Sequence, residues 1–170
     1  AAVVEFLDGK PVVFRGADLP HLILGNDAYE EELKDIRNYS PFGGEKDPLP
    51  RYPREDPRFR WAAVMLREDD AAAAPHERAF AILERMDLGP TRWSTVFDLR
   101  SGRLWFKTEA APMLKWLDFP SEQLACPQPP RALDIHAEAA GDVSPLLAPL
   151  TDEENRRAVE AAWKALDIGA

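Results

Sequence analysis

Two short apolar segments joined by an Asp-Gly pair lie close to residue 1, and this pattern constrains the fold more than any other. The segments are Val3 to Leu7 and Pro11 to Phe14, with Asp8-Gly9 between them. Asp-Gly readily adopts the positive φ angles that a tight turn between antiparallel strands needs. The sequence therefore predicts a β-hairpin, and with it an antiparallel sheet.

Helical spacing of apolar residues dominates the middle of the chain. We expect helices over residues 29–39, 58–67 and 75–86, where apolar side chains recur every three or four positions. A short buried strand, Leu22 to Leu24, is predicted before the first helix. A loop rich in proline, glycine and charge is predicted over residues 40–57, and a loop of that length is usually functional or mobile.

The last part of the chain returns to strands and ends in a helix. Residues 92–99 and 104–108 predict a second hairpin, and weaker strands are expected over 113–119 and 132–135. Thr151 and Glu154 form a capping box for a helix running to about Leu166, which should bury Val159 and Trp163. The sum is an α+β layout with mostly antiparallel strands, within the size of one ordinary domain.

Composition excludes several classes of function. The formal net charge of -9 disfavours binding to nucleic acid, because phosphates repel an acidic surface. No apolar run approaches the ~20 residues that span a bilayer, so we expect a soluble protein with no membrane partner. The three histidines are far apart and show no ligand spacing, so we expect no metal site and no cofactor.

Two residues stand out as candidates for chemistry. Asn26 follows a short apolar segment and a glycine, where its side-chain N–H could face a developing oxyanion or could cap the next helix. Arg58 opens a helix after a long loop, and its guanidinium could orient a nucleophile, hold a carboxylate or lie in solvent. Cys126 lies in a proline-rich connection without a nearby histidine, which favours a structural role.

Six motifs in the same order resemble the choloylglycine hydrolase (penicillin V acylase) family. They cover roughly Val3 to Ile135, and in this sequence they read Val-Val-Glu-Phe-Leu-Asp-Gly-Lys (3–10), Leu-Gly-Asn-Asp-Ala-Tyr (24–29), Leu-Lys-Asp-Ile-Arg-Asn-Tyr (33–39), Pro-Arg-Phe-Arg-Trp-Ala-Ala (57–63), Thr-Arg-Trp-Ser-Thr-Val-Phe-Asp-Leu (91–99) and Leu-Trp-Phe-Lys-Thr (104–108). Gly25 stands where the family has threonine, and the loop before Arg58 lacks the family's Gly-Asp-x-Ser-Ser run.

The resemblance implies the N-terminal-nucleophile hydrolase fold, an αββα sandwich of antiparallel sheets. It also implies hydrolysis of a linear, non-peptide C–N amide. In the family, a cysteine at the mature N-terminus attacks the amide carbon and its own α-amine relays the proton. By this resemblance Asn26 would be an oxyanion-hole donor. Arg58 would lie beside the nucleophile and hold it as a thiolate.

The resemblance further implies that residues 1–170 are the C-terminal half of such a domain, because the family's nucleophile lies in an N-terminal half. We therefore expect the N-terminal half of the same protein as partner, and these residues alone to be inactive. Half a sandwich should expose a sheet face and dimerise or aggregate. Penicillin V, conjugated bile salts and acyl-homoserine lactones all remain open as small-molecule amide substrates. The alternatives are a non-catalytic remnant that binds a ligand or partner, and a structural domain sharing only the antiparallel layout.

Overall fold

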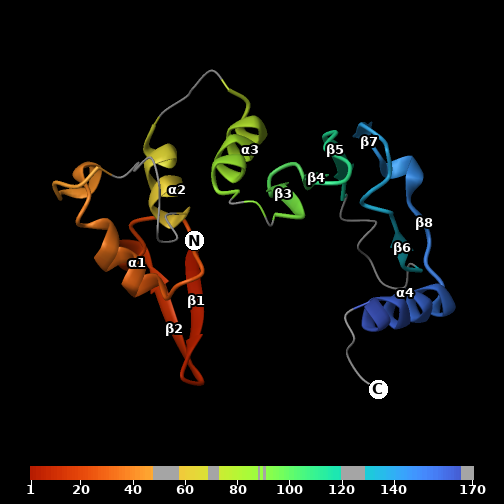
Figure 1. Cartoon of the computed structure of the whole chain (residues 1–170), viewed down its shortest axis with the longest axis horizontal. Coiled ribbons are helices and arrows are strands. Elements are labelled where there is room, and N and C mark those ends of the chain that lie inside the picture. The colour runs from red at the N-terminus through yellow and green to blue at the C-terminus, as the bar shows by residue number, and fades with distance from the viewer. Residues whose placement is uncertain (48–57, 69–72, 88, 90, 120–128, 166–170) are drawn as a thin grey trace. The chain divides into compact units, whose positions relative to one another are not determined.

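The computed structural model describes residues 1–47, 58–68, 73–87, 89, 91–119 and 129–165, and the chain in it forms two compact units (Figure 1). The first unit is Ala1–Leu88 and the second is Gly89–Ala170. Cys126, for which a structural role was predicted, lies outside the described residues, and so do residues 48–57 of the predicted loop. Within the described ranges, no helix is long and apolar enough to cross a membrane.

The first unit combines a β-hairpin with three helices. Its elements, in chain order, are β1 (Ala2–Leu7), β2 (Lys10–Arg15), α1 (Tyr29–Ile36), α2 (Arg58–Arg67) and α3 (Pro75–Arg85), with short 3-10 turns at Gly16–Asp18 and Ser40–Phe42. The predicted hairpin is confirmed: β1 pairs with β2 antiparallel, and the turn residues Asp8 and Gly9 have φ angles of 51° and 75°. The predicted helices are confirmed too, although the first ends at Ile36 rather than Tyr39.

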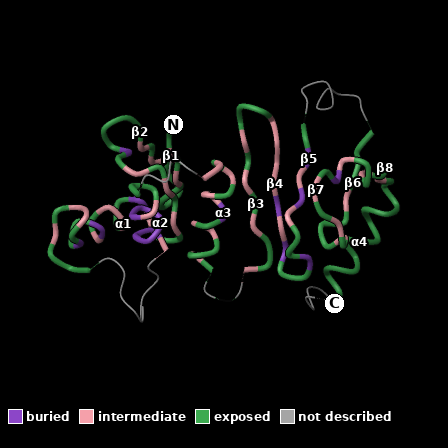
Figure 2. The backbone as a smooth tube through the Cα atoms, turned by 90° about the horizontal axis from the view of Figure 1, so that it is seen from above, coloured by how far each residue is buried: buried purple, intermediate pink, exposed green. Residues whose placement is uncertain are grey.

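The core of the first unit lies between the hairpin and the helices α1 and α2. The buried residues Leu19, Tyr29, Ile36, Phe59 and Ala63 form it, and Figure 2 shows the buried segments gathered on α1 and α2. Helix α2 is buried on all sides from Phe59 to Val64, unlike the one-sided burial of a surface helix. A helix that is buried all round fixes its first residue firmly in place.

The strand predicted at Leu22 to Leu24 is wrong. The structure has no strand there, and Leu22 and Leu24 are 69 % and 59 % exposed. Ile23 alone of the three packs against the core. An apolar run of three residues does not specify a strand without a neighbour to supply the hydrogen bonds, and here the chain passes the core as an irregular segment.

The second unit is built on a four-stranded sheet with the strand order β3-β4-β5-β7. Its elements are β3 (Trp93–Asp98), β4 (Arg103–Thr108), β5 (Lys115–Asp118), β6 (Arg131–Ala132), β7 (Gly141–Asp142), β8 (Ala148–Pro149) and α4 (Asp152–Ala165), with a 3-10 turn at Ser144–Leu146. β3, β4 and β5 pair antiparallel, β7 joins β5 in parallel, and β6 pairs with β8. The predicted second hairpin is therefore confirmed, whereas the strands expected over 113–119 and 132–135 are shorter, and the second begins one residue earlier.

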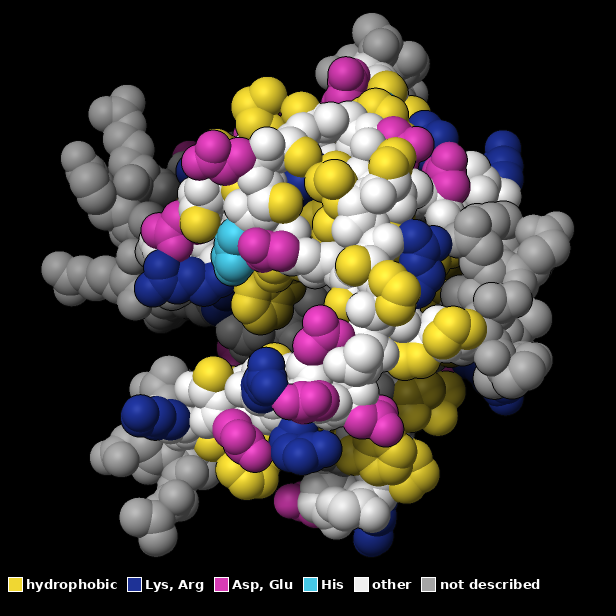
Figure 3. Space-filling view, turned by 90° about the vertical axis from the view of Figure 1, so that its right-hand side faces the viewer, with side chains coloured by type: hydrophobic (Ala, Val, Ile, Leu, Met, Phe, Trp, Pro, Cys, Tyr) yellow, Lys and Arg dark blue, Asp and Glu magenta, His cyan; other side chains and the backbone are white. Residues whose placement is uncertain are grey.

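Helix α4 begins as the sequence predicts, but its apolar face is not covered. The backbone N–H of Glu154 donates to Oγ1 of Thr151 at 3.2 Å, and the Thr151 N–H donates to the Glu154 carboxylate at 2.9 Å, which completes the capping box. The expected burial is wrong: Val159 and Trp163 are 42 % and 60 % exposed. In the space-filling view of Figure 3, hydrophobic side chains stand at the surface beside charged ones.

The architecture is thus α+β with mainly antiparallel sheets, as predicted. In the first unit, Val3 and Phe14 of the hairpin pack against the core, while Val4, Phe6 and Val13 on its other face are exposed. In the second unit, Trp93 and Phe97 are exposed on the same sheet face as the buried Phe106, because cross-strand partners share a face.

Candidate active site in the first unit

Asn26 lies in the irregular segment that leads into α1, and its side chain is exposed. The alternative in which Asn26 caps α1 is wrong, because the N-cap residue is Ala28 and no side chain caps the helix there. The carboxylate of Glu5, on β1, instead accepts the Tyr29 N–H through both oxygens at 3.1 Å. Asn26 is therefore not needed to start the helix, and its amide is open to solvent.

Tyr29 fixes the path of the chain just before Asn26. It is fully buried, and its hydroxyl donates to the backbone C=O of His21 at 2.7 Å and accepts the His21 N–H at 3.3 Å. Its ring also packs on Phe14 and Phe59, with ring centroids 4.8 and 5.8 Å away. The segment carrying Asn26 is thus tied at both ends to the buried core.

Gly25 explains why the segment can approach helix α2 so closely. A Cβ atom placed on Gly25 would lie 2.4 Å from Oε1 of Glu32 and 3.5 Å from Cβ of Phe59. The first distance is a clash with the end of a flexible side chain, so a threonine at position 25 would require the Glu32 carboxylate to move.

Arg58 is the first residue of α2 and is half-buried rather than surrounded by solvent. The residue after it, Phe59, is the one that Gly25 approaches. The structure thus brings together the two chain segments that carry Asn26 and Arg58, although they are separated by about thirty positions in the sequence. The catalytic roles of the two side chains stay a prediction.

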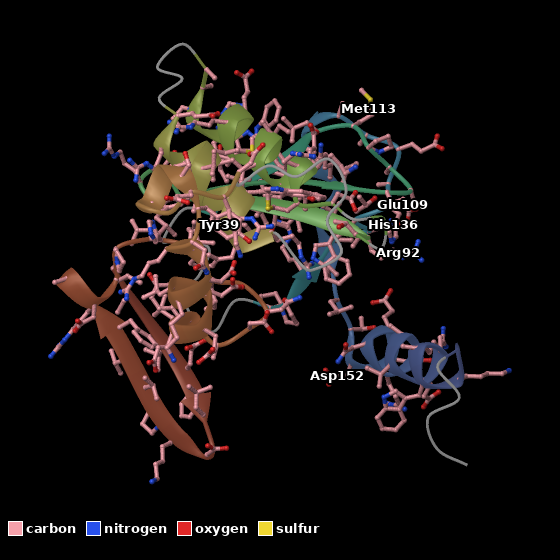
Figure 4. All side chains as sticks on the ribbon, turned by 60° about the vertical axis from the view of Figure 1, so that its left-hand side comes forward. Tyr39, Arg92, Glu109, Met113, His136 and Asp152 are labelled. Atoms are coloured by element: carbon pink, nitrogen blue, oxygen red, sulfur yellow. The ribbon has the colours of Figure 1, made fainter. Side chains whose placement is uncertain are left out.

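Arg60 anchors α2 to the end of α1. It is 6 % exposed, its guanidinium stacks 4.1 Å from the ring centroid of Tyr39, and it donates to the Tyr39 hydroxyl (Tyr39 is labelled in Figure 4). Its Nη1 also lies 3.4 Å from Oδ2 of Asp35. Arginine suits such a site, because its planar guanidinium can stack and donate hydrogen bonds at once. These contacts hold Arg58, two residues earlier, in a fixed position.

His21 is a titratable group that the sequence did not single out. Its ring meets Phe42 and Phe59 edge-on, with centroid distances of 5.2 and 6.3 Å. Burial, and then the positive charge of Arg67, hold the pKa of His21 below its ordinary value. No sequence pattern joins His21 to Tyr29, because the contact uses backbone atoms of His21 and depends on the path of the chain.

The described residues offer no obvious place for a metal. Within them, no group of three or more histidine, cysteine, aspartate or glutamate side chains is arranged to hold an ion. What the first unit does offer is an amide N–H donor and a guanidinium on neighbouring segments. Such a pair suits the stabilisation of negative charge.

Comparison with known proteins finds a likeness among solved structures. No protein-family model and no curated protein matches the sequence. Among solved structures, the chain is similar to penicillin V acylase from Agrobacterium tumefaciens, with a TM-score of 0.70 and 21 % sequence identity. The match covers 88 % of this chain but only 53 % of that chain. At this identity the likeness establishes the fold alone, and it confirms what the motifs predicted: the chain has the fold of a penicillin V acylase, over about half of that protein's length.

Proposed function

We propose that this chain is the C-terminal part of an amide hydrolase of the choloylglycine hydrolase (penicillin V acylase) family. Six sequence motifs in the family's order support the assignment, and so does the fold shared with the Agrobacterium acylase. The observation that carries it is the close approach of Gly25 to Phe59, which joins the segment of Asn26 to the start of helix α2. A chance likeness of fold would not require those two motifs to meet.

In the proposed reaction, an N-terminal cysteine supplied by an upstream segment is the nucleophile. Its thiolate forms a bond to the amide carbon, and the carbonyl oxygen becomes an oxyanion that the Asn26 amide N–H stabilises. Collapse of this intermediate breaks the C–N bond, and the amine leaves with a proton from the α-ammonium group of the cysteine. Water then attacks the thioester, releasing the acid and restoring the thiol.

Arg58 has an electrostatic role in this proposal. A fixed positive charge beside a thiol lowers its pKa, which raises the fraction of reactive thiolate at neutral pH. The N-terminal end of α2 adds a partial positive charge of the same sign. Arg60 and its contacts with Tyr39 support this role, because they hold the first turn of the helix in place.

An upstream segment is part of the proposal, and the fold match supports it. The match leaves nearly half of the Agrobacterium acylase without a counterpart in this chain.

The test is to express these 170 residues together with the polypeptide encoded directly upstream, and to measure amide hydrolysis. Penicillin V, a conjugated bile salt and an acyl-homoserine lactone would be the substrates. We expect Asn26→Ala to lower kcat by about 10²–10³, the usual effect of losing one oxyanion donor. Arg58→Ala should shift the acidic limb of the pH–rate profile to higher pH, whereas Arg58→Lys should restore part of it.

Asn155→Ala and Arg156→Ala are matched controls, because both residues are exposed on α4. Both should leave the rate unchanged. If the wild-type protein hydrolyses none of these amides while binding one of them, the alternative of a non-catalytic ligand-binding remnant is favoured. If it hydrolyses an amide and neither Asn26→Ala nor Arg58→Ala changes the rate, the site assignment is wrong.

A further inference from the structure

His21 begins the chain segment that carries Asn26 and ends at Tyr29, and its ring lies between aromatic side chains. The imidazole meets Phe42 and Phe59 edge-on, with interplanar angles of 86° and 88°. The backbone N–H and C=O of His21 are both hydrogen-bonded to the Tyr29 hydroxyl. The ring and the backbone of His21 are therefore fixed by different neighbours.

Phe59 connects His21 to both parts of the candidate site. Its ring contacts the His21 ring, and its Cβ lies 3.5 Å from where a Cβ on Gly25, the residue before Asn26, would be. Phe59 also directly follows Arg58 and is buried. A buried ring in a close-packed core has little room to shift. If the His21 ring moves off Phe59, the movement is therefore taken up by the segment that leads to Asn26 and not by helix α2.

The surroundings of the His21 ring favour its neutral form. Phe42 and Phe59 carry no charge, and the Tyr29 hydroxyl is engaged with the main chain of His21. The charged group that acts on the ring is Arg67 of α2, whose guanidinium lies 5.3 Å from the ring centroid of Phe42. Burial first, and Arg67 second, hold the pKa of His21 below its ordinary value, and no carboxylate among the described residues opposes them. A proton on the ring therefore costs free energy unless the ring moves toward water.

We propose that His21 is a positioning residue of the candidate site: its neutral ring keeps Asn26 in place for the oxyanion, and proton uptake by the ring withdraws this donor in acid. The inference rests on the proposed function, which gives Asn26 its role. Protonation moves the ring away from Phe59 and toward water, and Asn26 follows because it lies on the same short segment. Asn26 acts on an oxyanion that forms only in the transition state, so the loss should fall on kcat rather than on KM.

Two substitutions at His21 test the inference in the protein co-expressed with its upstream polypeptide. His21→Phe keeps an aromatic ring that is never charged. Its kcat at neutral pH should stay close to that of wild type, and the part of the acidic limb that belongs to His21 should vanish. His21→Lys carries a charge throughout the assay range, so KM should be unchanged. Its kcat should be about tenfold lower at every pH, a smaller loss than for Asn26→Ala, because the donor is displaced and not removed.

Nuclear magnetic resonance adds a readout that a merely structural role would not move. With isotope-labelled histidine and asparagine, the side-chain amide signals of Asn26 should shift with the same midpoint pH as the His21 ring. Arg67→Gln removes the repelling charge, so both midpoints should rise together. The Asn155 signals are the internal control, because this exposed residue lies on α4 in the second unit. His136→Phe is the matched control for the kinetics: it changes another exposed histidine, labelled in Figure 4, and should leave the acidic limb unchanged.

The outcomes separate the two proposals. If His21→Phe keeps the complete acidic limb of wild type, or the Asn26 signals do not follow the His21 titration, the inference about His21 is wrong even where amide hydrolysis is observed. A His21→Lys protein whose KM rises while its kcat is unchanged would also overturn it. If a His21 variant does not fold, the titration of the wild-type protein decides alone. If the Asn26 signals follow His21 but the protein hydrolyses no amide, the proposed function fails and the coupling between the two residues stands.

Discussion

Replacing Tyr29 by phenylalanine tests whether the segment before Asn26 is held as described. The hydroxyl of Tyr29 makes both of its hydrogen bonds to the backbone of His21, at 2.7 and 3.3 Å. Without it, a carbonyl and an N–H lose their partner beside a fully buried ring. Buried groups left unsatisfied cost about 1–3 kcal/mol. Because His21 is only half-buried and water can replace part of the loss, we expect the unfolding free energy to fall by about 1–2 kcal/mol.

For a unit of this size, that loss corresponds to a fall in Tm of roughly 5–15 °C. Urea unfolding followed by circular dichroism would measure it, and hydrogen exchange would assign it to the first unit, since the two units can unfold separately. Tyr29→Leu serves as the comparison. It also removes the ring contacts with Phe14 and Phe59, so it should cost clearly more than Tyr29→Phe.

The reasoning would be refuted by a Tyr29→Phe protein as stable as wild type to within about 0.5 kcal/mol, the size of an ordinary surface substitution. It would also be refuted if the lost protection appeared only in the second unit. Either result would mean that the hydroxyl does not fix the chain ahead of Asn26.

Two other predictions concern the same region. The pKa of His21 is held below its ordinary value of 6.5 by burial and by Arg67, so the unfolded chain takes up the proton at a higher pH than the folded chain. The free energy of unfolding of the first unit should therefore be largest above pH 6.5 and should decline as the pH falls below that value. The substitution His21→Gln should remove this part of the pH dependence. Urea titrations at several pH values would measure both effects. Gly25→Ala should lower the free energy of unfolding by less than about 1 kcal/mol, because the new Cβ meets only the movable end of the Glu32 side chain, and a double-mutant cycle with Glu32→Ala should show the two changes to be non-additive.

Either prediction has a clear contrary result. An unchanged pH profile in His21→Gln would mean that the imidazole is as free to ionise in the folded chain as in the unfolded one. Additive effects of Gly25→Ala and Glu32→Ala would mean that the two residues do not contact each other.

Local patterns in the sequence predict much of the fold, because some residues fix their own backbone. Asp8-Gly9 specifies its turn, Thr151 and Glu154 specify a helix start, and helix α2 has the predicted bounds Arg58–Arg67. The turn and the capping box depend on their own residues rather than on distant contacts. The mixed α+β class followed from the order of such segments.

What the sequence could not supply is which apolar side chains are covered. Leu22, Leu24 and Trp163 were expected to be buried and are exposed, because cover depends on neighbours that periodicity does not identify. In the candidate site, family motifs pointed to Asn26 and Arg58. These motifs did not indicate the hydrogen bond from the Tyr29 hydroxyl to the His21 C=O, because its acceptor is a main-chain atom.

Intact-mass analysis of the native protein, before and after brief exposure to an amide substrate, tests the central claim most directly. We expect a mature chain that begins with cysteine upstream of residue 1 and contains residues 1–170. Acid quenching should trap a mass increase equal to one acyl group on that cysteine, and the adduct should be lost when the cysteine is replaced by serine or alanine. A native protein without an N-terminal cysteine, or one that hydrolyses amides with no acyl adduct on it, would contradict the account.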